Sequence, residues 1–443
     1  MDLETIAKVT GALGRTRARA PCGRVVRASG GLLEIDGLAR SARLGDRVRL
    51  GPPPGLRGEV VRIGPDGVDV LPDGPVDGIA RGALARLSPA PALAPDDSWI
   101  GRVLDPDGRP LDGRPLLPGP RTRPIRHAPP PAHDRRPLGP RMETGLAVMN
   151  TLLPVVRGQR LGLFAGSGVG KSSLLAQLAR GIEADVVVIA LVGERGRELR
   201  HFTDDVLGPD GMARTVLVAA TSDRAPQTRR RCAWAATTVA EHFRDEGRQV
   251  LLLVDSVTRF AEAHREVAVT AGEPAALRGF PASTGPQIAA LCERAGPGTG
   301  MAGDITAVYS VLVAGSDMEE PVADWLRGVL DGHVVLDREI AERGRFPAID
   351  VLRSVSRALP AAASPSENAV IGEARRHLGT WDRAALMVQS GLYSAGSDPA
   401  VDTAIAVRGP LESFFARTGE TSVPASFAAL RRALATAGDE RGH

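Results

Sequence analysis

The sequence predicts an α/β protein with a parallel-sheet core, a small β-barrel domain before the core and a helical domain after it. Three observations carry this prediction. Several short β-type runs fill residues 22–90, apolar runs then alternate with helical patterns from about residue 145 to 360, and the chain beyond residue 361 has a helical pattern. Alternation of strands and helices is typical of a parallel sheet covered by helices.

Composition places the chain among globular proteins. It has 443 residues, 43% of them apolar, which is enough for a packed core in roughly two or three domains. The net charge is only +3, with acids and arginines interleaved, so nothing demands a nucleic-acid partner. We find no signal peptide and no apolar run near the ~20 residues of a membrane span, which favours the cytoplasm. Cys22, Cys232 and Cys292 are too few and too far apart for a disulfide framework or a metal cluster.

Residues 1–20 are predicted to form a short amphipathic helix with a basic character. Its apolar face consists of Leu3, Ile6, Val9 and Leu13. Two interpretations stay open: a surface for a partner or an anionic membrane, and a helix whose charged face is simply solvated.

Residues 21–90 are predicted to form a small closed β-barrel. Short strands recur over about 70 residues, and Gly64, Pro65, Asp66 and Gly67 form a hairpin turn between two of them. The segment contains no Phe, Tyr or Trp. Because proteins that bind single-stranded nucleic acid normally stack bases on aromatic rings, we expect the barrel to be structural and to form contacts between subunits.

Residues 91–360 are assigned to the core domain and residues 361–443 to a smaller helical domain. The proline-rich part at 91–140 is predicted to be a linker, packed onto the core by Trp99 and Met142. Strands are expected at 160–164, 185–191, 215–219, 249–254 and 305–313, and helices at 171–181, 197–207, 226–246 and 321–330.

The stretch 160–178 has the order of strand, glycine-rich turn and helix that a phosphate-binding P-loop requires. Its glycines let backbone N–H groups converge on phosphate oxygens, and the helix adds the positive end of its dipole. Lys171 is expected to reach the terminal phosphates and the Ser172 hydroxyl to bind Mg²⁺. The motif departs from G-x-x-x-x-G-K-[ST] at Ala165, but the next residue is a glycine that supplies a flexible entry to the loop. The residues expected to bind nucleotide here are Gly166, Ser167, Gly168, Val169, Gly170, Lys171, Ser172 and Ser173.

Lysine usage gives an independent argument for Lys171. Among 55 basic residues only Lys8 and Lys171 are lysines, and all others are arginine. A lysine in the P-loop of such a chain indicates a place that needs a compact point charge on a flexible stem instead of a planar guanidinium.

Two acidic residues follow apolar strands at the same predicted edge of the sheet. Asp255 ends the run at 251–254, as expected of the carboxylate that holds the Mg²⁺ shell in P-loop hydrolases. Glu194 follows the strand at 185–191, where a carboxylate can orient and deprotonate a water for in-line attack on a γ-phosphate. The alternative role for Glu194 is capping of the next helix. Arg195 beside it can pair with phosphate or hold Glu194.

These motifs, together with GEPAALRGFPAS, RGVLDGHVVLDR, RFPAIDVLRSVSRAL and GSDPAVDTAI, resemble the ATPase of type III export systems, most closely its flagellar branch. That family is similar to the catalytic β and structural α subunits of rotary ATP synthases. The resemblance extends from about residue 22 to 410. It implies ATP hydrolysis with Mg²⁺, a RecA-like core, and a homohexameric ring of three-domain subunits with sites at the subunit interfaces.

The resemblance also assigns the groups that carry the chemistry. Glu194 matches the catalytic glutamate, and Lys171, Ser172 and Asp255 match the phosphate and magnesium ligands. Non-catalytic subunits of the related synthases carry glutamine where Glu194 stands, which excludes an α-like subunit.

Five further residues are assigned by the same resemblance. Arg195 and Arg259 match arginines near the γ-phosphate. Phe346 occupies the position of the aromatic that stacks on adenine, and Tyr393 is placed on the other side of that ring. Arg357 matches the arginine finger that reaches the neighbouring subunit's site.

One segment departs from the family pattern. Ser283–Pro286 stands where the family has a bulkier segment, which leaves the order of this loop open but not the chemistry.

Four alternative functions are compatible with parts of the sequence. Glu194 argues against a module that binds ATP without hydrolysing it, and the barrel without aromatics argues against a hexameric RNA helicase. Arg357 and Glu194 in one chain suit a homohexamer better than the alternating ring of a proton-driven synthase. A virulence-type secretion ATPase is separated from the flagellar type only by overall likeness.

The resemblance implies partners and a location as well. The expected partners are a regulator or stator protein at the N-terminal segment, a central stalk protein, the export gate and chaperone–substrate complexes, with no nucleic acid. The expected location is the cytoplasm, with peripheral association with the inner face of the cytoplasmic membrane.

Overall fold

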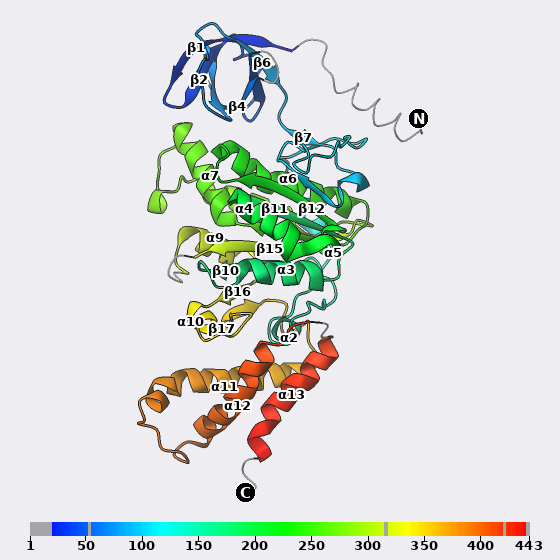
Figure 1. Ribbon diagram of the computed structural model, residues 1–443, viewed down its shortest axis with the longest axis vertical. Coiled ribbons are helices and arrows are strands. Elements are labelled where there is room, and N and C mark those ends of the chain that lie inside the picture. The colour runs from blue at the N-terminus through cyan, green and yellow to red at the C-terminus, as the bar shows by residue number, and fades with distance from the viewer. Residues whose placement is uncertain (1–19, 52–54, 314–317, 420–421, 440–443) are drawn as a thin grey trace.

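The computed structural model describes residues 20–51, 55–313, 318–419 and 422–439. Along the long axis of the molecule in Figure 1, an N-terminal barrel lies at the top, an α/β sheet in the middle and a group of helices at the bottom. This architecture confirms the predicted fold class. The helix predicted for the N-terminal segment falls on residues 1–19, which lie outside the described residues.

The barrel closes in the strand order β1-β2-β5-β4-β3-β6. Alternate side chains of each strand point inward and fill the barrel with aliphatic residues such as Leu33, Ile35, Val60 and Val70. The predicted hairpin turn at 64–67 joins β4 to β5, as expected. The strands are β1 (Cys22–Ser29), β2 (Leu32–Asp36), β3 (Arg47–Leu50), β4 (Leu56–Ile63), β5 (Gly67–Pro72) and β6 (Leu84–Ser88).

The central sheet has the order β17-β16-β10-β15-β13-β11-β12-β8, with β14 paired to β15. Among its described strands, β17 and β14 pair antiparallel and the others pair parallel. Its strands are β8 (Arg102–Leu104), β10 (Arg160–Ala165), β11 (Val186–Glu194), β12 (Thr215–Thr221), β13 (Val250–Asp255), β14 (Gly296–Pro297), β15 (Asp304–Leu312), β16 (Gly332–Leu336) and β17 (Ile349–Ser356); β7 (Ala92–Leu93) and β9 (Arg123–Pro124) form a separate pair.

Helices cover both faces of this sheet, which explains why its strands are apolar on both sides. In β11, Val188 and Ala190 belong to one buried cluster with residues of α6–α9, whereas Ile189 and Leu191 belong to another with residues of α2 and α3. The helices are α2 (Ala147–Thr151), α3 (Lys171–Gly181), α4 (Gly196–His201), α5 (Gly208–Met212), α6 (Pro226–Asp245), α7 (Val257–Thr270), α8 (Thr284–Cys292), α9 (Pro321–Val329) and α10 (Arg338–Glu342), with short turns η1 (Asp97–Trp99), η2 (Ala132–Asp134), η3 (Phe202–Leu207) and η4 (Leu277–Gly279).

The C-terminal part consists of α11 (Pro365–Gln389), α12 (Pro399–Phe415) and α13 (Val423–Asp439). A capping box in which Ser364 and Glu367 satisfy each other's backbone N–H groups begins α11. Phe414 and Leu430 join the buried cluster on the α3 face of the sheet, so these helices are packed onto the core.

The predicted strands and helices of the core are confirmed, but two expectations need correction. The helix expected at 197–207 is α4 followed by the π-helical turn η3. The interpretation of 91–140 as a linker is wrong at β8, which pairs parallel with β12 at the edge of the sheet. The reason is that β12 pairs with this short segment, and Arg102, which donates to both carboxylate oxygens of Asp112 at 2.6 and 2.9 Å, folds the passage back on itself. Trp99 and Met142 pack on the core as expected.

Buried charges fix the barrel on the core. Glu59 of β4 accepts hydrogen bonds from Arg230 at 2.7 Å and Arg231 at 3.3 Å, both on α6. The side chains of all three are at most 7% exposed. Gln227 at the start of α6 adds hydrogen bonds to the backbone carbonyls of Leu71 and Pro72 in the barrel. A buried ion pair that loses one partner is costly, so the barrel and α6 are held as one unit.

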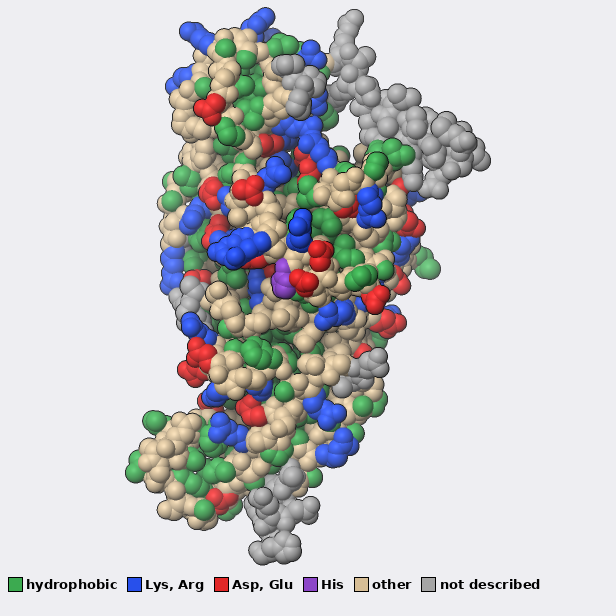
Figure 2. Space-filling model, in the orientation of Figure 1, with side chains coloured by type: hydrophobic (Ala, Val, Ile, Leu, Met, Phe, Trp, Pro, Cys, Tyr) green, Lys and Arg blue, Asp and Glu red, His purple; other side chains and the backbone are tan. Residues whose placement is uncertain are grey.

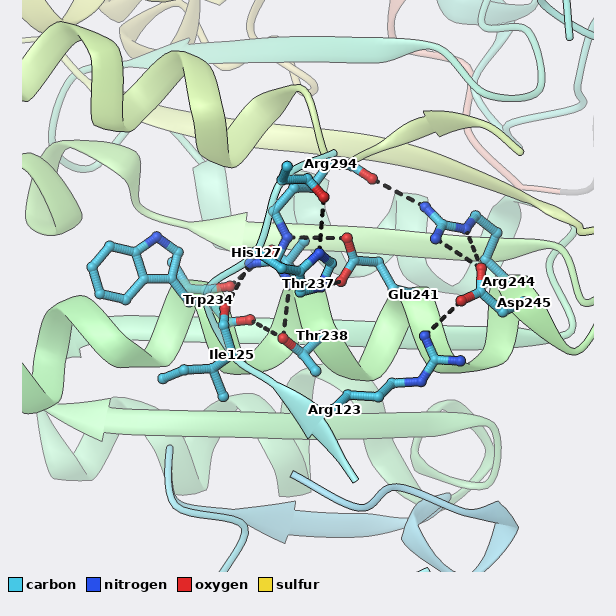
Figure 3. A network of polar contacts seen from close by, with 12 residues as sticks. Arg123, Ile125, His127, Trp234, Thr237, Thr238, Glu241, Arg244, Asp245 and Arg294 are labelled. Carbon is cyan, nitrogen blue, oxygen red and sulfur yellow. Dashed lines mark hydrogen bonds and ion pairs between the residues drawn. The ribbon is translucent and has the colours of Figure 1, made fainter. Parts of the chain in front are cut away.

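A second buried network joins α6 to the proline-rich passage and to the residues after α8 (Figure 3). Glu241, fully buried, accepts from the Arg294 guanidinium at 3.0 and 2.6 Å and lies 2.9 Å from His127. Arg294 also donates to the Ile125 carbonyl and the Thr238 hydroxyl, each at 2.8 Å. Burial would raise the pKa of Glu241, but hydrogen bonds from His127 and Arg294 outweigh it and lower that pKa to about 2.

The surface shows no single-sign field on the face drawn in Figure 2, where acidic and basic side chains are interspersed. Within the described part of the chain no helix is long and apolar enough to cross a membrane. Cys22, Cys232 and Cys292 are all free thiols.

Replacing Glu241 with alanine should lower the free energy of unfolding by about 3–5 kcal/mol, because the buried Arg294 guanidinium then lacks its counter-charge. The matched control is Glu183→Ala, whose side chain is 85% exposed and lies 3.6 Å from Arg157, and which should change stability by less than about 1 kcal/mol. Chemical denaturation followed by circular dichroism measures both variants. Equal losses in the two would contradict a stabilising role for the network.

The same carboxylate predicts a pH dependence. Because the folded-state pKa of Glu241 is lowered from 4.5 to about 2, its stabilisation is full above pH 4.5 and is lost as the pH falls toward 2. Wild type should therefore lose stability over this range more steeply than Glu241→Gln. Parallel slopes for the two proteins would show that Glu241 is not the titrating group.

Candidate active site

The carboxyl edge of the parallel sheet brings three charged side chains together. β10 leads into the P-loop and α3, while β11 ends at Glu194 and β13 ends at Asp255. Because these strands run parallel, their carboxyl ends meet at one edge of the sheet. The Lys171 ammonium donates a hydrogen bond to Asp255 Oδ1 and lies 3.9 Å from Glu194 Oε1.

The P-loop adopts a conformation that only glycine accommodates easily. Gly168 and Gly170 have φ angles of 79° and 87°, in the left-handed region. A Cβ atom on Gly170 would also lie 3.3 Å from Cδ1 of the Phe346 ring. No side chain caps the start of α3, so its first N–H groups are left for another acceptor. The loop therefore has the features of an anion-binding turn.

A cleft of about 1060 Å³ opens in front of these residues. Its floor is the P-loop, and further walls come from the end of β11, from α7 and from the loop that carries Arg278 and Phe280. A nucleotide fits a cavity of this size, since ligand pockets usually span roughly 300–1,000 Å³.

The carboxyl group of Glu194 has a raised pKa. Burial raises the pKa of Glu194, a hydrogen bond with Glu198 and the negative charge of Asp255 raise it further, and Lys171 opposes them, so that the pKa is about 7. A carboxylate with this pKa can accept a proton from water near neutral pH. The alternative role as a helix cap is not seen, because Arg195 occupies the cap position of α4 and no side chain bonds the cap.

Asp255 and Ser172 offer oxygen ligands for a hard cation. Asp255 is 4% exposed and accepts hydrogen bonds from Lys171 and from Ser310, the latter at 2.7 Å. Ser172 lies in the first turn of α3 and lines the cleft. Carboxylate and hydroxyl oxygens suit Mg²⁺, which takes its remaining ligands from phosphate and water. Among the described residues no group of three or more His, Cys, Asp or Glu side chains could hold a metal by itself.

Two of the predicted arginines line this cleft. Arg195 is exposed, and its guanidinium lies 3.9 Å from Glu198 and not in a bond to Glu194. Arg259 of α7 donates to Glu262 at 2.9 Å. Both arginines therefore line the same cleft as Lys171 and Glu194.

The other three predicted residues lie elsewhere. Phe346 is 51% exposed, with its ring against Gly170. Tyr393 lies between α11 and α12, where its hydroxyl donates to Asp402 at 2.8 Å. Arg357 is exposed after β17 and donates to the Arg327 carbonyl at 3.1 Å. Neither Tyr393 nor Arg357 lines the cleft of its own chain.

The sequence interpretation missed several residues that line the cleft. They are Arg229, Thr258, Glu262, Arg265, Arg278, Phe280. The sequence does contain a pattern that could have indicated three of them. Directly after Asp255, the residues Thr258, Glu262 and Arg265 have the i, i+4, i+7 spacing of one helix face.

The segment Ser283–Pro286 lies at the start of α8. Ser283 precedes α8, and its backbone N–H and hydroxyl both donate to the Glu273 carboxylate, at 2.9 and 2.7 Å. The Ser283 hydroxyl also lies 2.8 Å from His264 Nε2 on α7. These bonds close the neck of the loop that carries Arg278 and Phe280 to the cleft.

Two family models each match one part of the chain, and known proteins match most of its length. Residues 145–356 match the ATP synthase alpha/beta family, nucleotide-binding domain, and residues 363–436 match the T3SS EscN ATPase C-terminal domain. The flagellum-specific ATP synthase of Caulobacter vibrioides is 43% identical over 424 residues, which cover 93% of this chain and 95% of that protein. The type 3 secretion system ATPase of Xanthomonas euvesicatoria is 41% identical over 387 residues, which cover 86% of this chain and 87% of that protein.

A solved structure of a type III secretion ATPase has a similar fold. The assembled ATPase EscN of the enteropathogenic E. coli type III secretion system is similar with a TM-score of 0.86 at 36% identity, covering 93% of this chain and 100% of that chain. The chain therefore belongs to the family of flagellum-specific ATP synthases and type III secretion system ATPases, and it is an ATPase built on an ATP synthase alpha/beta nucleotide-binding domain.

Proposed function

We propose that this chain hydrolyses ATP with Mg²⁺ to energise the delivery or unfolding of export substrates in a flagellar type III export apparatus. The observation that carries the proposal is the convergence of Lys171, Glu194 and Asp255 at one edge of the sheet. The flagellum-specific ATP synthases of Caulobacter vibrioides and Salmonella typhimurium, each 43% identical, favour the flagellar branch. The 41% identity to the Xanthomonas euvesicatoria protein keeps a virulence-type secretion ATPase as the alternative.

Lys171 and the P-loop bind the phosphates. The ammonium has three donors, and it exchanges its hydrogen bond with Asp255 for phosphate oxygens when ATP binds. Phe346 then packs on adenine, because its ring already lies beside Gly170 at the start of α3. Tyr393 is proposed to approach the other side of the base.

Ser172 and Asp255 would hold Mg²⁺. A bound Mg²⁺ would supply positive charge that offsets the negative charge of the phosphates. Asp255 keeps a fixed orientation for this purpose because it is buried at the end of β13.

Glu194 acts as the general base. It orients the attacking water and accepts its proton, while Arg195 and Arg259, which line the same cleft, would stabilise negative charge on the γ-phosphate. The raised pKa of the Glu194 carboxyl suits this transfer near neutral pH.

The active unit is proposed to be a homohexamer of subunits with domains at 21–90, 91–360 and 361–443. Arg357 is exposed and outside the cleft of its own chain, which suits a role in the neighbour's site. The E. coli relative was solved assembled and in complex with its central stalk EscO, at a TM-score of 0.84 and 36% identity for the complex. We extend this to a stalk protein here, with a stator or regulator protein, the export gate and chaperone–substrate complexes as further partners.

The location that follows is the cytoplasm, at the inner face of the cytoplasmic membrane. A strain that lacks this chain should be non-motile and should retain hook and filament proteins inside the cell. Normal motility with loss of effector secretion would favour the virulence-type alternative.

Lys171→Ala removes the point charge at the terminal phosphates and should lower ATP turnover roughly 10²-fold or more. Phosphate release measured at saturating ATP checks this. Arg180→Ala, a basic residue on the same helix whose guanidinium donates to the Val206 carbonyl, is the control and should turn over normally. Wild-type turnover by Lys171→Ala would refute the assignment of the P-loop.

Glu194→Gln separates binding from chemistry. The amide keeps the size of the side chain but cannot accept a proton, so nucleotide should bind with near-normal affinity while hydrolysis is lost. Binding of a fluorescent nucleotide and single-turnover hydrolysis measure the two effects. Glu198→Gln retains the base and should still hydrolyse ATP. Collapse of nucleotide affinity in Glu194→Gln would mean a structural role for this residue.

Mixed rings test the role of Arg357. Arg357→Ala and Lys171→Ala should each be inactive, since a trans arginine is worth about 10³–10⁵ in rate in other nucleotide hydrolases. When equal amounts of the two variants are mixed under conditions in which rings reassemble, some interfaces will combine an intact Lys171 with an intact Arg357 from the neighbouring subunit. Part of the ATPase activity should therefore return. If no activity returns, Arg357 does not act in trans. The competing interpretation, a surface arginine paired with Asp350, predicts near-normal activity for Arg357→Ala; in the structure the Asp350 carboxylate accepts from the N–H groups of Leu352 and Arg353.

A further inference from the structure

Strand β15 lies between the two strands that deliver the phosphate-binding and acidic groups. It pairs parallel with β10, where Leu163 lies opposite Ser310, and with β13, where Val254 lies opposite Tyr309. This register places Ser310 directly beside Asp255, the next residue of β13. Ser310 is fully buried on this strand, where a hydroxyl without a hydrogen-bond partner would be costly, so the partner of this hydroxyl is informative.

The partner of Ser310 is the Asp255 carboxylate. Ser310 Oγ donates to Asp255 Oδ1 at 2.7 Å, and the serine is fully buried. The Lys171 ammonium donates to the same oxygen. One carboxylate oxygen thus has two donors of different kinds, a mobile cation on a long stem and a neutral hydroxyl on a central strand.

Resting on the proposed function, we propose that Ser310 is a positioning residue that keeps the Asp255 carboxylate oriented toward the magnesium–nucleotide complex. When Lys171 turns to the phosphates, Ser310 is the donor that stays with Asp255. Its single hydroxyl proton holds Oδ1 without neutralising the carboxylate, and Oδ2 remains free to accept from the metal's shell.

Two physical features support this role. The short Ser310 side chain rises from the middle of a buried parallel sheet, so few other positions are open to its hydroxyl. Hydrogen-bond partners that orient ligating carboxylates typically change metal affinity about 10–100-fold when removed. The effect should therefore appear in Mg²⁺ dependence and not in nucleotide affinity as such.

The test is Ser310→Ala, with binding of a fluorescent ADP analogue titrated at fixed nucleotide against Mg²⁺ and also measured in EDTA. The Mg²⁺ concentration that gives half of the maximal change in nucleotide binding should rise about 10–100-fold. The affinity of the variant for the ADP analogue in EDTA should stay within about twofold of wild type. ATP hydrolysis should need correspondingly more Mg²⁺, and Ser310→Thr, which keeps the hydroxyl, should recover most of the wild-type requirement.

Thr306→Val is the matched control. Thr306 lies on the same strand, is 3% exposed, and accepts a hydrogen bond from the Gly158 N–H at 3.0 Å, away from Asp255. It should leave the Mg²⁺ requirement unchanged. An unchanged requirement in Ser310→Ala, an equal loss of binding with and without Mg²⁺, or the same shift in Thr306→Val would each overturn the proposal.

The outcomes separate this proposal from the proposed function. If the wild type is active but Ser310→Ala has the same Mg²⁺ requirement, only the positioning role of Ser310 is refuted. A wild type that binds no nucleotide under any condition defeats both. Thermal unfolding of Ser310→Ala close to wild type would confirm that the binding measurements report on the site.

Discussion

The ammonium of Lys171 lies between the carboxylates of Glu194 and Asp255, and the core is arranged so that these three charges meet. A buried acid and a partly buried acid at one sheet edge would repel each other and take up protons if no cation lay between them. Burial and a hydrogen bond with Glu198 raise the pKa of Glu194, the negative charge of Asp255 raises it further, and the Lys171 ammonium opposes this rise only in part. The trio carries a net negative charge when ionised, and the arginines that line the cleft add positive charge around it.

The rest of the fold keeps the charged side chains at that sheet edge in fixed positions. Helices on both faces bury the strands, so each acid is held by a rigid strand end. The barrel is held to α6 by Glu59 with Arg230 and Arg231, and α6 is tied to the passage after α8 by Glu241 and Arg294. Buried pairs of this kind are a poor source of net stability, but they penalise any arrangement in which a partner is missing. These buried pairs therefore fix the positions of the barrel, α6 and the passage after α8 relative to one another.

Much of this arrangement could be predicted from the sequence, because its signals are local. The P-loop, the strands that end in Glu194 and Asp255 and the barrel hairpins depend on glycine placement and short-range periodicity. The edge strand β8 could not be predicted: it is three residues long within a proline-rich passage and exists because β12 pairs with it. Ser310 was missed because its importance depends on the register between β15 and β13, which no local pattern records. The roles of Tyr393 and Arg357 depend on how nucleotide or a second subunit approaches, and they stay predictions.

The scarcity of lysine has a practical consequence for experiments. Lys171 is the one lysine among the described residues, its side chain is 12% exposed, and Lys8 is the only other in the sequence. Among the described residues, Lys171 at the base of the cleft is thus the one lysine that amine-directed reagents can modify and after which lysyl endopeptidase can cleave. Occupancy of the nucleotide site can be followed as protection of one peptide in a mass spectrum, without a label on the nucleotide and without interference from the surface arginines.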